Sequence, residues 1–376
     1  MFLTPVILDV LFTLLKSAAY SLGQKLGEVA GDYIGSKVER SSISALLPSS
    51  VKEDPRYVEA LTKYEQSFTH ANQLKEQELQ QQKEFSKQLL ELLREWQANQ
   101  IQGKLKEIQA IFDQKNLATI FSREESYNIL VEGQRKHRLL VLVSPPNVSP
   151  SCPSSLQHDL QIELPEKLKT FLNQYYSLDS NLCPVECFGD YFNRAIGDAD
   201  IRQLQTILAP VPTVILHSKV TDYEVYFHVN FWNPQSSAIA KFSIAAWNWE
   251  DAKESLQTVG NNETQAIRII RQIIVTVQQL LAAFVADWYY LNLNPTYEPQ
   301  LFYLESAFVS GGLTRDLVKP YINSLQEIQQ QQREAYEQKL MGLRRKITKK
   351  EPKNYTQNDL DIVLLSFLIY MGFSHF

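Results

Sequence analysis

Two polar residues stand where predicted β-strands end in the middle of the chain. Asp190 follows a short predicted strand at residues 185–188, and His217 closes another at residues 213–217. In open α/β sheets ligands commonly bind at the carboxyl ends of strands, and a carboxylate or an imidazole there can act as a general acid or base. These two residues are therefore the candidate acid/base pair, while solvated loops and helix caps are the alternative interpretation of such polar positions.

Three cysteines raise the question of a metal site. Cys183 and Cys187 form a CPVEC pair that could ligate zinc if His158 or Cys152 lay close by. A zinc site normally has a clear second pair of ligands, and the sequence shows none. We therefore expect no metal and no cofactor. An odd number of cysteines in a long chain also argues against a disulfide framework and indicates a reducing compartment.

No catalytic motif is complete. The sequence contains no Walker A loop, GxGxxG turn, HExxH helix, GxSxG elbow or kinase signature, so phosphate cradling and the common hydrolase mechanisms are not supported. Whether the protein is an enzyme stays uncertain, and a non-enzymatic role is favoured. The formal net charge of −5 provides no general attraction to a phosphate backbone, so nucleic acid is not an expected partner.

Glycines recur at every fourth position of an apolar helical segment predicted at residues 1–47. The four are Gly23, Gly27, Gly31 and Gly35. Because a glycine costs about 1 kcal/mol in a helix interior, the repeat favours a smooth face that another helix can approach closely. Self-association is the functional interpretation, and tight packing within one soluble chain is the alternative.

A basic cluster near the other end of the chain precedes an apolar segment. The cluster is Arg344, Arg345, Lys346, Lys349 and Lys350, and an apolar helix is predicted at residues 354–376. A basic segment beside a short apolar helix is a combination that binds anionic membrane surfaces. A membrane surface is therefore a predicted partner, beside the chain itself as a homo-oligomer and an unknown protein.

Two Gln-rich helical regions flank the centre of the chain. The first, at residues 56–135, is predicted as a long coiled-coil-like arm, and the second lies within a helical region at residues 260–350. Phe85, Leu89 and Leu92 follow a heptad spacing in the first arm, but the later apolar set that begins at Ile101 is shifted by two residues. A Gln-rich helix at residues 321–347 is a predicted antiparallel partner for this arm.

Residues 136–250 have the pattern of a small α/β domain. Strands are predicted at residues 138–143, 185–188, 213–217, 224–232 and 238–247, with helices at residues 156–176 and 198–208. Alternating strands and helices followed by a meander predict a mixed sheet of about five strands, with a parallel start and an antiparallel edge. The fold class is therefore mixed α+β, mostly helical, with long coiled-coil-like helices flanking one α/β domain.

Three hypotheses about function follow. The first is a non-enzymatic, self-associating protein that engages a membrane surface through its apolar termini, and this mixture of segments resembles bacterial membrane-acting or scaffold proteins. The second is an enzyme or ligand-binding protein with a site at the strand ends of the α/β domain. The third is a soluble structural scaffold. Asp9 interrupts the first apolar run, which also lacks a basic leader, so we expect a cytoplasmic protein, peripheral at the inner face of a membrane.

Overall fold

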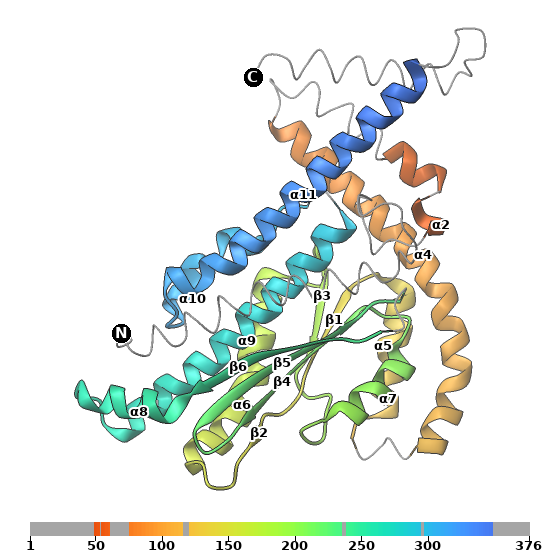
Figure 1. Ribbon diagram of the computed structural model, residues 1–376. Coiled ribbons are helices and arrows are strands. Elements are labelled where there is room, and N and C mark those ends of the chain that lie inside the picture. Colours follow the sequence, from red (N-terminus) through yellow and green to blue (C-terminus); the bar gives the residue numbers. More distant parts are fainter. Residues whose placement is uncertain are drawn as a thin grey trace.

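The computed structural model describes residues 49–52, 54–60, 75–115, 120–234, 238–294 and 297–348 (Figure 1). The glycine segment with Gly23, Gly27, Gly31 and Gly35 lies outside these residues, as do Lys349, Lys350 and the apolar segment at 354–376. Arg344, Arg345 and Lys346 lie in the last turns of helix α11, where the backbone is described.

The described residues form a mixed α+β fold around one sheet, as the sequence predicts. The strands of its five-strand core are β1 (Leu139–Val143), β3 (Val185–Phe188), β4 (Thr213–Val220), β5 (Glu224–Trp232) and β6 (Ala240–Asn248). They are ordered β3-β1-β4-β5-β6. β1 pairs in parallel with β3 and β4, while β5 pairs antiparallel with β4 and β6. The predicted parallel start and antiparallel edge are thus confirmed.

A short strand, β2 (Asn147–Val148), continues the path of β1 along β4 after Pro145 and Pro146. β2 pairs in parallel with the last residues of β4, through Asn147 beside Lys219 and Val148 beside Val220. β4 is longer than predicted because β5 pairs with it as far as Val220, and β2 pairs with its last two residues on the other side. This extension places His217 inside the strand and moves the carboxyl end of β4 to Val220.

One face of the sheet is covered by α6 (Ser154–Tyr175) and α9 (Glu263–Leu293) (Figure 1). α9 is, among the described helices, the one long and apolar enough to cross a membrane by length and composition, and 89% of its most apolar stretch is buried in the fold. α11 (Arg315–Thr348) packs on its outer side, after α8 (Trp249–Thr258), the 3₁₀ helix η2 (Gln300–Tyr303) and α10 (Glu305–Ser310). An apolar helix covered on several sides belongs to a protein core.

α6 continues through Pro165, which the sequence marks as a possible break. The helix passes close to the end of β3 at this point. A Cβ atom added to Gly189 would lie 2.6 Å from Cβ of Pro165 and 3.3 Å from its carbonyl oxygen. Gly189 is therefore needed because α6 and the chain after β3 approach too closely for a side chain.

The opposite face of the sheet carries a second, smaller core. Leu140, Leu142 and Ile215 point from the sheet into this core. α5 (Arg123–Arg135), α7 (Asp198–Leu208) and the second half of α4 (Lys75–Lys115) cover it. β1 is buried along its whole length because helices lie on both of its faces.

The shift in the heptad pattern of α4 corresponds to a change of packing partner. Phe85, Leu89 and Leu92 are buried in the main core with α9, whereas Ile101 and Ile108 are buried in the second core with α5. Two residues correspond to about 200° of rotation on an α-helix, so the offset turns the apolar stripe to the other side of α4. These positions are thus buried within the described fold, and α11 packs on α9 and α10.

Candidate functional site

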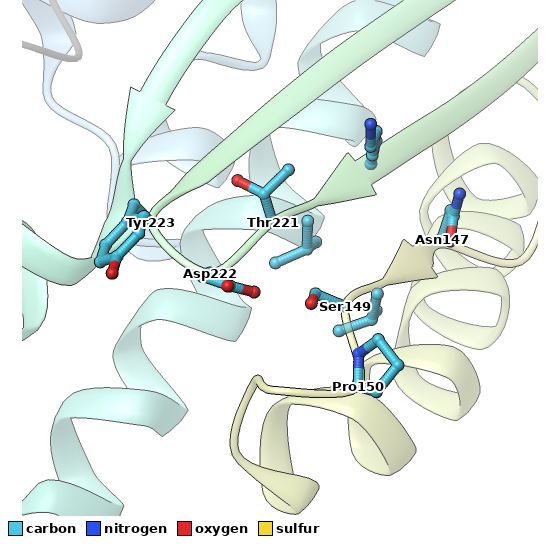
Figure 2. A pocket seen from close by; sticks show the side chains of 9 residues that line it. Asn147, Ser149, Pro150, Thr221, Asp222 and Tyr223 are labelled. Carbon is cyan, nitrogen blue, oxygen red and sulfur yellow. The ribbon is translucent and has the colours of Figure 1, made fainter.

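The carboxyl ends of β2 and β4 border a hollow of about 320 Å³ (Figure 2). We call it the strand-end hollow. It is lined by Asn147, Val148, Ser149, Pro150, Lys219, Val220, Thr221, Asp222 and Tyr223. Because β2 and β4 are parallel, both chains leave the sheet at the same edge, which is where α/β sheets commonly place a ligand site.

The loop from β2 to α6 forms one rim of the strand-end hollow. Gln157, in the first turn of α6, holds this loop with its side-chain amide. Its Nε2 donates to the carbonyl oxygens of Ser149 at 3.1 Å, Pro150 at 3.0 Å and Cys152 at 2.7 Å. The rim is therefore fixed by a group on the helix that follows it.

The β4–β5 turn forms the opposite rim and is fixed by Trp249. The buried indole Nε1 donates to the carbonyl oxygen of Thr221 at 2.9 Å, and the backbone N–H of Trp249 donates to the carbonyl oxygen of Tyr223 at 2.8 Å. The thiol of Cys152 also donates to the carbonyl oxygen of Thr221 at 3.3 Å and so joins the two rims. Both rims are thus held by side chains that belong to the body of the domain.

Asp222 is the one carboxylate of the strand-end hollow. The hydroxyls of Ser149 and Ser151 donate to this carboxylate and lower the pKa of Asp222 below its ordinary value. Figure 2 shows the side chains of Asp222 and Ser149 pointing toward one another. Asn147 and Lys219 precede Val148 and Val220 on the two strands, so their side chains point to the opposite face of the sheet from those of the two valines.

His217 lies in β4 directly opposite His228 of β5. The two imidazole rings are stacked with their centroids 4.6 Å apart, and Asn230 Nδ2 lies 3.0 Å from His217 Nε2. Burial, with a smaller contribution from His228, lowers the pKa of His217 to about 4. A histidine with this pKa is neutral at pH 7 and a weak base, which does not suit general base catalysis at that pH.

Asp190, the other candidate acid/base residue, is exposed just after β3. Its charge contributes, after burial, to the raised pKa of Glu125. The carboxylate whose charge acts on His217 is that of Asp198 at the start of α7, which is also bound to Lys241 at 2.8 Å. The structure does not bring Asp190 and His217 together, because β1 lies between the strands that carry them.

The three cysteines are free and buried. Burial raises the pKa of Cys183 to about 11 and that of Cys187 to about 12, so both thiols stay protonated and are poor metal ligands and nucleophiles. Within the described ranges, no three His, Cys, Asp or Glu side chains are grouped so that they could hold a metal ion.

Sequence reasoning did not find the strand-end hollow. Two weak signals point to it in retrospect: the Ser- and Pro-rich run at residues 149–155, and the polar turn Thr221-Asp222-Tyr223 between two strands. Neither is specific, because such residues are common in turns. Comparisons of the chain with protein-family models, with curated proteins and with solved structures found no match.

Proposed function

We propose that this protein is a non-enzymatic, self-associating interaction protein of the cytoplasm that engages a membrane surface through its two terminal segments. The terminal segments are residues 1–47, with Gly23, Gly27, Gly31 and Gly35, and residues 344–376, with the basic cluster. We call the described fold between these two segments the body of the protein. Three observations support this proposal, and the second carries it.

The body buries its own apolar helices. The most apolar stretch of α9 is 89% buried, and the heptad residues Phe85, Leu89 and Leu92 of α4 are 2%, 2% and 5% exposed. The described helices therefore have no need of lipid to cover these residues. We therefore assign membrane contact to the apolar segments at the two ends of the sequence.

Described residues that follow the first terminal segment and precede the second lie near the carboxyl end of α9. Residues 54–60 pack on α4, where the ring of Tyr57 lies 6.0 Å from that of Phe85, and the adjacent Ser86 accepts a hydrogen bond of 2.7 Å from Asn294 Nδ2. From the other side, Gln332 of α11 donates to Asn292 Oδ1 at 3.2 Å. Terminal segments that continue from these two points can reach the same membrane surface or the same partner.

The geometry of α11 suits this arrangement. From Gln332 the helix continues to Thr348, which is about 24 Å at 1.5 Å per residue. Arg344, Arg345 and Lys346 occupy its last turns. Although the whole chain has a net charge of −5, these residues concentrate positive charge in one part of the sequence, and each Lys or Arg near an anionic surface contributes about 1 kcal/mol to binding.

Flotation of the full chain with vesicles tests the membrane part of the proposal. We expect binding to phosphatidylcholine vesicles that contain phosphatidylglycerol. Replacing Arg344, Arg345, Lys346, Lys349 and Lys350 with Gln should abolish most of it. A control variant with five exposed lysines of the body replaced with Gln, namely Lys83, Lys87, Lys106, Lys169 and Lys319, should still float.

Two results would contradict the membrane proposal. The first is a full chain that stays with the unbound protein in every gradient. The second is equal binding by the cluster variant and the control variant, because that would show attraction by total charge and not by the predicted segment.

A further inference from the structure

We draw no further inference here: the strongest candidate, the two buried hydrogen-bond donors Gln97 Nε2 and Arg138 Nη1 that meet beside Gly133 between α4, α5 and the start of β1, carries none, because a methyl group of Ile101 occupies the space beside Gly133 and nothing in the described residues shows what accepts hydrogen bonds from the two donors.

Discussion

The hydroxyl of Tyr297 donates a hydrogen bond of 2.5 Å to the carboxylate of Asp287, deep in the fold. Asp287 is fully buried in α9. Its carboxylate also accepts hydrogen bonds from the hydroxyl of Tyr176 at 3.0 Å and from the backbone N–H groups of Gln300 at 3.0 Å and Leu301 at 2.7 Å. One side chain of α9 thus fixes the end of α6 and the start of η2.

Replacing Asp287 with Asn should therefore destabilise the protein although the two side chains are nearly the same size. The amide nitrogen of Asn would face N–H or O–H donors, and each buried group left unsatisfied costs about 1–3 kcal/mol. We expect a loss on the order of 3 kcal/mol in the free energy of unfolding, measured by urea denaturation. The same change at the exposed Asp113 of α4 should have little effect. A loss of less than about 1 kcal/mol would show that the carboxylate is not needed there.

The buried imidazole of His137 should make the free energy of unfolding fall at acidic pH. The ring lies between Gln97 Oε1, 2.7 Å from Nδ1, and the hydroxyl of Tyr289, 2.9 Å from Nε2. Burial, with a smaller effect of Arg138, lowers the pKa of His137 from 6.5 to about 3. The stability that depends on the neutral ring is therefore fully present above pH 6.5 and is lost as the pH falls toward 3, because the unfolded chain binds the proton more readily.

The expected size of this effect is about 1.4 kcal/mol per pH unit, or about 3 kcal/mol between pH 6.5 and about pH 4. His137→Gln removes the titrating group but leaves the other histidines in place, so the difference between the two proteins isolates His137. Urea denaturation of both across this range provides the measurement. Parallel stability curves would contradict the prediction.

Two glycine-to-alanine changes should have opposite effects. Gly189→Ala places a Cβ 2.6 Å from Cβ of Pro165, in contact with a helix backbone that cannot easily move. We therefore expect the free energy of unfolding to fall by about 1–3 kcal/mol. Gly103 lies in the interior of α4, and a Cβ added to it would have no atom of another element within 4 Å. Gly103→Ala should therefore raise the free energy of unfolding by about 0.5–1 kcal/mol. Thermal melting compares them, and equal effects of the two changes would be inconsistent with the packing of α6 on β3.

Replacing a buried heptad residue of α4 with alanine distinguishes packing within the chain from pairing with a second chain. Leu89 is 2% exposed in the main core and Ile101 is fully buried in the second core. Leu89→Ala and Ile101→Ala should each reduce the free energy of unfolding by about 2–5 kcal/mol. If α4 instead served mainly to pair with a second chain, these variants would dissociate an oligomer and keep the stability of the folded chain.

Larger residues in the glycine repeat should weaken self-association. We expect Gly27→Leu and Gly31→Leu to lower the association constant of the full chain about tenfold or more, because close helix contact depends on small side chains. Sedimentation equilibrium measures this constant. Gly103→Leu is the matched control, since that position faces open space. Unchanged association in the repeat variants, or a monomeric full chain, would refute the proposed role of the repeat.

Local pattern was sufficient to locate most elements of the α/β domain. Period-two and continuous apolar runs identified all five core strands to within a few residues, and the helix predicted at residues 198–208 coincides with α7, whose N-cap is Gly197. These features depend on neighbours in the sequence, so they are readable without the fold. The main exception is β4, which extends to Val220 because β5 pairs with it along its whole length and β2 pairs with its last two residues.

The candidate acid/base pair shows where local pattern stops being informative. Asp190 and His217 both follow or end strands as predicted, yet the insertion of β1 between β3 and β4 separates them. The partners of His217 are instead His228 and Asn230, which belong to the next strand. Strand order is a relation between distant segments, and a single sequence without its pairings does not state it.

The sequence by itself determined the types of the elements, the mixed character of the sheet and the two-residue shift in the apolar stripe of α4. Only the tertiary structure decided that this shift serves two cores, that Asp287 is bound by four donors, and that loops 70 residues apart form the strand-end hollow. The physical reason is that periodicity records which side of an element is buried, whereas the identity of the neighbour on that side depends on how all the elements pack together.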